Sequence, residues 1–369
     1  MSKMYKLLAL LVVALFAFSA CGGDSDYDFR VALLAHSPDS ILDDGSFNTG
    51  AWLGIQRAVA THGLSEGQVQ FFQPRIASDD ERINMMRDII EDWGADIIVL
   101  PGFHFVTAAY TAQELFPNTR FILLDATPND GAEPPNVRIA PNLISVHYAE
   151  HESGFLAGYA AVMEGYRTLG FTGGVPIPPV IRFGHGFVQG AEHAANVLGL
   201  AQGDVTITYL YFGQFGPQPE FNVQAASMFA TGTEVIFTAA GGANHSVFAA
   251  ADAAGASSIG VDADQSGYST SVITSAVKGL EASVYALIND HLNNRWPGAE
   301  GGRERELVFD AARNGVGLVM GDTNRMSNFT QAQYDSIFAQ VASGAIRVND
   351  SLVMSDILSG INLVVVNEV

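Results

Sequence analysis

The chain has little of three things: cysteine, positive charge and long hydrophobic runs. Its 369 residues include one cysteine, Cys21, so no disulfide can form within the chain and the folded body must be stable through its core alone. Lysine and arginine number 18 against 39 aspartates and glutamates, which gives a net charge of −21. Such an acidic surface repels nucleic acids and anionic lipid head groups, so a neutral or cationic ligand fits better.

The single notable hydrophobic run lies near the N-terminus and fits an export signal. Lys3 and Lys6 precede an apolar stretch over 7–18, and the small residues Ser19-Ala20 follow it. This order is that of a signal peptide, and the stretch is shorter than the roughly 20 residues of a transmembrane helix. The next residue, Cys21, stands where bacterial lipoproteins carry their lipid.

We therefore predict a signal peptide over 1–20, lipidation at Cys21 and a flexible, polar tether over 21–28. Phe18 departs from the pattern, because bacterial lipoproteins usually have leucine there, and an ordinary secretory signal with an incidental cysteine is the alternative. The predicted location is the bacterial cell membrane, with the protein lipid-anchored and facing the periplasm or exterior. The body that remains, about 345 residues, is long enough for two domains.

The body alternates short β-rich runs with amphipathic helical stretches, which is typical of parallel sheets flanked by helices. In a first series we expect strands over 31–35, 69–73, 96–100 and 120–124, and helices over 47–62, 79–93 and 106–116. In a second series we expect helices over 152–164, 180–198, 219–230 and 244–254, and strands over 168–172, 205–211, 234–238 and 258–261. The C-terminal part holds a long helix near 279–294, further strands and a helix near 331–343.

Two successive series of similar size predict two similar lobes, with the C-terminal part crossing back between them. We expect one lobe over 29–147 and about 278–310, and the other over 148–277 and about 311–369. Open parallel sheets bind ligands at the carboxyl ends of their strands, so two facing lobes would hold a small molecule between them. The expected strand ends carry Asp43-Asp44, Pro101-Gly102-Phe103, Asp125, Gly241-Gly242 and Asp262.

Several short motifs follow one another along the mature chain. They are Asp43-Asp44-Gly45-Ser46-Phe47-Asn48 with Ala51-Trp52-Leu53-Gly54, Glu152-Ser153-Gly154-Phe155-Leu156-Ala157-Gly158-Tyr159, Gly170-Phe171-Thr172-Gly173-Gly174, Phe183 with Gly186-Phe187, Ala239-Ala240-Gly241-Gly242, and Gly260-Val261-Asp262-Ala263-Asp264-Gln265. In this order and spacing the chain resembles the basic membrane protein lipoproteins, which include the purine nucleoside receptor of ABC importers. The resemblance implies a two-lobed, type I periplasmic-binding-protein-like α/β fold.

The chain departs from that family next to the expected pocket. The family usually has lysine at the position of Gly45, and often an acidic residue or threonine near His36 and Ser37. Gly-Thr-Gly commonly stands where this chain has Gly242-Ala243-Asn244. These departures bear on the identity of the ligand more than on the fold.

The resemblance implies an aromatic clamp for a nucleoside base. Phe47 and Phe183, one from each lobe, match aromatic positions of the family's pocket, although each can equally be a core residue. Asn48 can donate to and accept from a purine edge, or cap a helix beside Ser46. Asp125 can accept from a base N–H, or only anchor the turn that follows it.

Ribose hydroxyls need acceptors, and an ionised carboxylate such as Asp262 can accept from two of them. Lys278 can supply a matching donor that keeps this carboxylate charged, and two glycines, Gly241 and Gly242, let backbone amides approach a sugar. The remaining candidates are Asp44 and Phe103. Trp52 is expected to pack beneath the pocket instead.

Other motifs are set aside on structural grounds. Gly63-Leu64-Ser65-Glu66-Gly67 matches the G-x-S-x-G of hydrolases, but that motif requires a strand before the turn and a helix after it, and here the expected order is the reverse. The segment that contains His147 and His151 begins at the end of an apparent strand. It lacks the H-E-x-x-H order of zinc hydrolases, so no metal is expected. Neither a P-loop nor a dinucleotide fingerprint occurs.

We therefore predict a lipid-anchored solute-binding protein that captures a nucleoside, in particular a purine nucleoside, and delivers it to an ABC permease. It needs no cofactor and is not an enzyme. One alternative is a binding protein of the same architecture for a sugar or a signalling compound. The other is an enzyme of nucleoside salvage.

Overall fold

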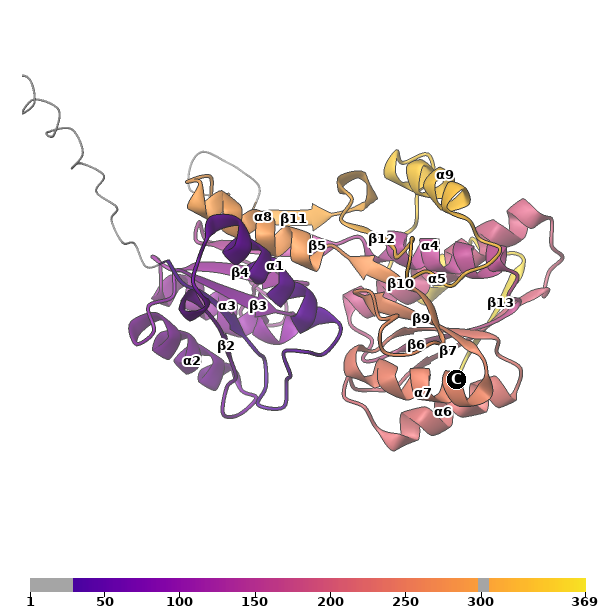
Figure 1. Ribbon diagram of the computed structural model, residues 1–369, viewed down its shortest axis with the longest axis horizontal. Coiled ribbons are helices and arrows are strands. Elements are labelled where there is room, and N and C mark those ends of the chain that lie inside the picture. The colour runs from indigo at the N-terminus through magenta and orange to yellow at the C-terminus, as the bar shows by residue number, and fades with distance from the viewer. Residues whose placement is uncertain (1–28, 298–304) are drawn as a thin grey trace, which may run out of the picture.

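The computed structural model describes residues 29–297 and 305–369, which form two β-sheets of mainly parallel strands, each with helices on both faces (Figure 1). The predicted signal peptide, lipidated Cys21 and tether lie outside the described residues. Each sheet with its helices is called a lobe below: the first lobe holds the N-terminal sheet, and the second holds the other. The α/β class and the two-lobed arrangement are those expected from the sequence.

The first sheet has the strand order β11-β5-β4-β3-β1-β2, and all its pairs are parallel. Its strands are β1 (Val31–Leu34), β2 (Val69–Phe72), β3 (Ile97–Pro101), β4 (Arg120–Leu124), β5 (Leu143–Tyr148) and β11 (Glu306–Phe309). Its helices are α1 (Phe47–His62), α2 (Asp79–Glu91), α3 (Val106–Leu115) and α8 (Leu280–Leu292). Because neighbouring side chains of a strand point to opposite faces, Val31 and Leu33 pack in the core with α1 and α8, whereas Ala32 and Leu34 pack in the core with α2 and α3.

The second sheet has the order β12-β10-β9-β8-β6-β7-β13, and only the β10–β12 pair is antiparallel among its described pairs. Its strands are β6 (Thr168–Gly173), β7 (Val205–Tyr211), β8 (Val235–Ala239), β9 (Ser257–Asp262), β10 (Val272–Lys278), β12 (Val316–Leu318) and β13 (Val364–Glu368). Helices α4 (Glu150–Glu164) and α5 (Pro178–Leu198) cover one face, and α6 (Pro219–Ala230) and α7 (Asn244–Ala254) cover the other. Two further helices, α9 (Gln331–Ala342) and α10 (Met354–Leu358), pack against α4 and α5.

The two sheets repeat one topology. The first contains the order β2-β1-β3-β4-β5, and the second contains β7-β6-β8-β9-β10, so each has its first strand between its second and third. In each sheet, the second strand lies on one side of the first strand, and the third strand lies on its other side. Doubly wound sheets bind ligands at the carboxyl ends of the strands, beside this switch in direction.

The chain passes between the lobes three times, after β5, after β10 and after β11. The C-terminal part therefore contributes α8 and β11 to the first lobe, and β12 and β13 to the second (Figure 1). The residue-level boundaries that we expected between the lobes remain a prediction. Among the described helices, none combines the length and the apolar character needed to span a bilayer.

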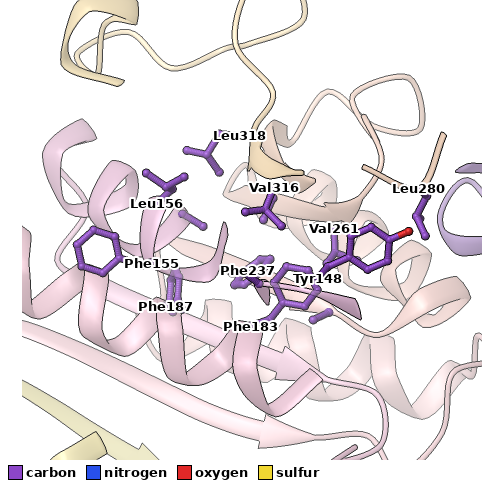
Figure 2. Packing of buried hydrophobic residues seen from close by; sticks show 14 of the residues in the cluster. Tyr148, Phe155, Leu156, Phe183, Phe187, Phe237, Val261, Leu280, Val316 and Leu318 are labelled. Carbon is purple, nitrogen blue, oxygen red and sulfur yellow. The ribbon is translucent and has the colours of Figure 1, made fainter. Parts of the chain in front are cut away.

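Helices α4 and α5 cross in close backbone contact, which accounts for the glycines in two of the sequence motifs. A Cβ added to Gly158 would lie 2.0 Å from the carbonyl oxygen of Phe187, and one added to Gly154 would lie 2.1 Å from that of Phe183. Figure 2 shows the phenylalanines of this region together in the core, with Phe183 and Phe187 near Phe237 of β8. The glycines thus set the depth at which α5 and Phe183 sit.

The motifs that the sequence analysis set aside occupy structural positions. Residues 63–67 lie between α1 and β2, so the order is helix, turn, strand, as expected. His147 lies in β5 and His151 in α4, so they do not share a helix face. Among the described residues, no group of three or more candidate ligands is placed to hold a metal ion.

Candidate ligand-binding site

A cavity of about 410 Å³ lies where the carboxyl ends of the two sheets face each other, and its lining comes from both lobes. The ten residues that the sequence analysis selected as ligand-binding all line this cavity: Asp44, Phe47, Asn48, Phe103, Asp125, Phe183, Gly241, Gly242, Asp262 and Lys278. Trp52 packs against the core and is absent from the lining. What each residue does for a ligand remains a prediction.

These residues converge because they follow the ends of parallel strands. Asp125 comes directly after β4, Asp262 ends β9, and Lys278 ends β10. Short 3₁₀ helices after β3 (η2, Phe103–Phe105) and β8 (η3, Gly241–Ala243) bring one further ring and two glycines to the same edge. The topology therefore gathers residues far apart in the sequence at one place.

Two of the carboxylates belong to residues with a positive φ angle. Asp125 has φ 55° and Asp262 has φ 66°, in the left-handed region that residues with a Cβ seldom adopt. Both lie at the carboxyl ends of strands, one in each lobe, and both side chains line the cavity. Backbone strain of this kind concentrates at functional sites, where the surrounding structure maintains it.

The centre of the site is an ion cluster around Lys278, which is 7% exposed. Its Nζ forms an ion pair with Asp125 and lies 3.5 Å from Oε1 of Glu150 and 3.6 Å from Oδ1 of Asp262. Burial by itself lowers the pKa of this ammonium, but the three carboxylates together raise it above its ordinary value. The sequence analysis paired Lys278 with Asp262, whereas the structure places it closest to Asp125.

Glu150 is a member of this cluster that sequence reasoning missed. It begins α4 directly after the crossover, is 1% exposed, and has Oε2 at 3.8 Å from the guanidinium of Arg182. Burial raises its pKa to about 8, against the opposing effect of Lys278. Its position just beyond the end of β5 is the signal that was available, because the other site residues follow strand ends in the same way.

Aromatic rings surround the ammonium from both lobes. Lys278 Nζ lies 5.0 Å from the ring centre of Phe47, 5.4 Å from that of Phe183 and 5.6 Å from that of Tyr148. Phe47 is only partly buried, whereas Phe183 is 2% exposed and also packs edge-on against Phe237. Phe183 is therefore both a wall of the cavity and a core residue, which were alternatives in the sequence analysis.

A second group of rings, also in the lining, comes from the first lobe alone. His36 and His104 stack with ring centres 4.4 Å apart, and the ring centre of Phe103 lies 4.0 Å from that of His104. Burial, followed by the charges of His104 and Arg82, lowers the pKa of His36 to about 4, so this imidazole is neutral at physiological pH. Sequence reasoning noted His36 as a departure and did not place it in the site.

The loop before α1 is held by its own hydrogen bonds. The carboxylate of Asp44 accepts from the backbone N–H groups of Ser46, Asn48 and Thr49, so it caps α1 in place of an N-cap side chain. Nδ2 of Asn48 donates to the carbonyl oxygen of Ile41 at 3.0 Å. These contacts make Asp44 and Asn48 supports of the loop that presents Phe47.

The chain is similar to known proteins of one family. The family model of PnrA-like ABC transporter substrate-binding proteins, named Bmp, matches residues 31–350. Basic membrane protein A1 of Borrelia garinii is 27% identical over 319 residues, 85% of this chain and 87% of that protein. The ABC transporter nucleoside-binding protein BmpA of Lactococcus lactis is 26% identical over 334 residues, 85% of this chain and 87% of that protein.

A more distant relative and a solved structure complete the comparison. An uncharacterised lipoprotein of Pyrococcus furiosus is 25% identical over 299 residues, 78% of this chain and 71% of that protein. The crystal structure of an ABC transporter solute-binding protein from Aeropyrum pernix superimposes with a TM-score of 0.72 at 22% identity, over 90% of this chain and 96% of that one. The chain belongs to the basic membrane protein family of PnrA-like ABC transporter substrate-binding proteins, which are binding proteins and not enzymes.

Proposed function

We propose that this substrate-binding protein captures a nucleoside, in particular a purine nucleoside, and presents it to an ABC permease from a lipid anchor at Cys21. The observation that carries the choice of ligand is a cavity that offers acceptors and aromatic rings together. Its lining includes the carboxylates of Asp125 and Asp262 and the rings of Phe47 and Phe183. The Lactococcus relative named above as nucleoside-binding supports the same choice.

The base is assigned to the space between the two lobes. Phe47 begins α1 of the first lobe and Phe183 lies in α5 of the second, so a flat base between them would contact both lobes at once. Stacking on an aromatic side chain contributes about 1–3 kcal/mol per base. A ligand favours the closed arrangement only through contacts that it makes better there, and contacts from both lobes satisfy that condition.

The ligand's donors are assigned to the carboxylates. Oδ1 of Asp125 is buried and has no hydrogen-bond partner among the described residues, while its Oδ2 pairs with Lys278. A buried acceptor without a donor costs about 1–3 kcal/mol, which a ligand N–H or O–H would recover. Asp262 receives a hydrogen bond from Ser46 on Oδ2, so its Oδ1 is available for a ribose hydroxyl beside Lys278.

The N-terminal sequence supports the lipid anchor, and the family supports the transporter partner. The apolar run, small residues and Cys21 support lipidation, and the Pyrococcus relative is called a lipoprotein. Membership of an ABC transporter substrate-binding family supports delivery to a permease. Mass spectrometry of the N-terminal peptide from the membrane fraction tests lipidation, and an unmodified Cys21 would refute it.

The test of the ligand is calorimetry with inosine and adenosine against ribose and glucose. We expect the nucleosides to bind and the Phe47→Ala variant to bind them at least about tenfold more weakly, because one stacking face is lost. Leu53→Ala is the matched control, since Leu53 lies on the same helix, is 43% exposed and is outside the lining. Binding of a sugar without any nucleoside binding would refute the nucleoside assignment.

Two further readouts address the alternatives. Mass spectrometry of any small molecule that copurifies with the protein identifies the ligand without a prior choice. Incubation with inosine, followed by an assay for free hypoxanthine, tests for nucleoside cleavage, and no free base is expected.

A further inference from the structure

The two lobes are joined beside the cavity by direct contacts between loops. The first-lobe loop is residues 43–46, before α1, and the second-lobe loop is residues 262–268, which begins at the last residue of β9. We propose that Tyr268 is a positioning residue that, together with Gln265, clasps the first-lobe loop and determines how firmly the cavity closes around its ligand. This proposal rests on the proposed function only in the choice of inosine as the ligand for the binding test.

Three hydrogen bonds link these loops, between residues 216 to 225 positions apart in the chain. Oγ of Ser46 donates to Asp262 Oδ2 at 2.6 Å, in a buried contact. Nε2 of Gln265 donates to the carbonyl oxygen of Gly45 at 3.1 Å. The Tyr268 hydroxyl lies 3.4 Å from Oδ1 of Asp43, a longer and weaker contact.

Gln265 is held rigidly for this contact. It is fully buried, and its Oε1 accepts from the backbone N–H of Val261 at 2.9 Å and from Nδ2 of Asn244 at 3.0 Å. Because the oxygen end of the amide is bound by two donors, the nitrogen end is directed toward the first lobe. The contact to Gly45 is therefore preorganised on the second lobe.

The ring of Tyr268 lies directly against Gly45. A Cβ at position 45 would lie 2.3 Å from the ring, closer than real Cβ contacts, and Gly45 also has φ 62°. On the second lobe the same ring meets His245 edge-on at 5.0 Å. Tyr268 is thus placed between a first-lobe glycine and a second-lobe residue that lines the cavity.

The clasp acts on the site without touching a ligand. Tyr268 is 44% exposed and is not among the residues that line the cavity, whereas the loop that it contacts continues into Phe47 and Asn48, which are. Loss of the clasp would lower the population of the closed form. The apparent dissociation constant rises as the binding-competent fraction falls, even when every ligand contact is intact.

The first experiment measures closure in the absence of ligand. Spin labels on Ile76→Cys and Val223→Cys, at positions 60% and 67% exposed on opposite lobes, report the interlobe distance in a full chain that carries Cys21→Ser. We expect Tyr268→Ala and Gly45→Ala to shift the distance distribution toward longer values, and Tyr268→Phe to keep the parent distribution because the ring remains. Tyr285→Ala is the control, since Tyr285 packs on Arg57 within the first lobe.

The second experiment measures inosine binding in the same variants. We expect Tyr268→Ala to bind about fivefold or more weakly, with a faster dissociation rate, and Tyr268→Phe to restore the parent affinity. Unchanged distances in both Tyr268→Ala and Gly45→Ala would overturn the clasp. So would a Tyr268→Phe variant that opens as far as Tyr268→Ala, because the ring contact would then not be responsible.

These results separate the clasp from the proposed function. If the parent protein binds no nucleoside, the nucleoside assignment fails while the interlobe distances still decide the clasp. If nucleosides bind and distances do not change, only the clasp fails. Circular dichroism of each variant shows whether it is folded. Because Tyr268→Ala and Gly45→Ala change different loops, one variant can still test the clasp if the other does not fold.

Discussion

At the scale of single residues, one ammonium stands among three carboxylates in the wall of the cavity. Buried charges are tolerated when they are paired, and Lys278 pairs with Asp125 while lying within 3.6 Å of two further carboxylates. With every group ionised, the carboxylates outnumber the ammonium, so the cluster is not neutral. Burial, opposed by Lys278 and reinforced by the negative charge of Asp125, raises the pKa of Glu150 to about 8, and a protonated Glu150 reduces that imbalance.

Glu150→Gln is expected to flatten the dependence of stability on pH. Burial raises the pKa of Glu150 from 4.5 to about 8, so between these values the folded protein holds a proton that the unfolded chain has released. The stabilisation is fully present below about pH 4.5 and is lost as the pH rises through about 8. Glutamine has no proton to lose, so the variant should lose less stability than the parent over that range. Urea denaturation near pH 5 and pH 9 measures the difference.

The control for this measurement is Glu281→Gln. Glu281 pairs with Arg57 at the surface, where its side chain is 46% exposed, and it lies outside the cavity lining. This variant removes a carboxylate of the same kind from outside the cluster, so a change seen only in Glu150→Gln belongs to the buried cluster. A Glu150→Gln profile that runs parallel to the parent would contradict a raised pKa for Glu150.

At the scale of secondary-structure elements, the glycines between α4 and α5 set the position of the second-lobe aromatic wall. Gly158 and Gly154 on α4 lie against carbonyl oxygens of α5. On α5, a Cβ added to Gly190 would lie 1.9 Å from the carbonyl oxygen of Phe155. Backbone atoms cannot turn aside as a flexible side chain can. A larger residue at these positions must therefore separate the two helices.

Gly158→Ala is expected to lower the free energy of unfolding by at least about 1–3 kcal/mol, the usual range for overpacking, because its Cβ would lie 2.0 Å from the carbonyl oxygen of Phe187. Nucleoside affinity should fall as well, since α5 carries Phe183. Gly67→Ala is the control, because an added Cβ there meets nothing closer than 3.9 Å. Equal urea midpoints for Gly158→Ala and the parent would show that α4 and α5 adjust at little cost.

At the scale of the whole molecule, two lobes with the same strand order face each other across an acidic site. The net charge of the chain is −21, and removal of the predicted signal peptide, which carries Lys3 and Lys6, would bring it to −23. The lysine in the cavity lining is already surrounded by carboxylates. The site therefore has no spare positive charge for a phosphate among its lining lysines and arginines.

A nucleoside monophosphate is accordingly expected to bind at least about a hundredfold more weakly than its nucleoside, because its phosphate brings negative charge against the carboxylates. Calorimetry with inosine and inosine monophosphate at physiological salt measures this ratio. Inosine with a 5′-O-methyl group is the control ligand, since it adds bulk without charge. Higher salt should narrow the ratio only in part, because the charges are buried. Comparable affinities for the two ligands would contradict the electrostatic account.

The amino-acid sequence by itself determined most of the elements and the edge at which the site forms. The helix over 47–62 and the strand over 120–124 were predicted with the bounds that α1 and β4 have, because periodicity and terminal residues are local signals. Alternating strands and helices imply parallel sheets, and parallel strands bring their carboxyl ends together. This is why the sequence predicts that residues as far apart as Asp44 and Asp262 lie at one cavity, which both of them line.

Only the tertiary structure decided which partners these residues have. The pairing of Lys278 with Asp125, the entry of Glu150 into the cluster and the contact of Tyr268 with Gly45 join segments that no local pattern relates. The same holds for β11 and β12, which are short and take their places from the sheets that they join. The physical reason is that periodicity reports which face of an element is buried, whereas the partner across that face is set by how the lobes pack.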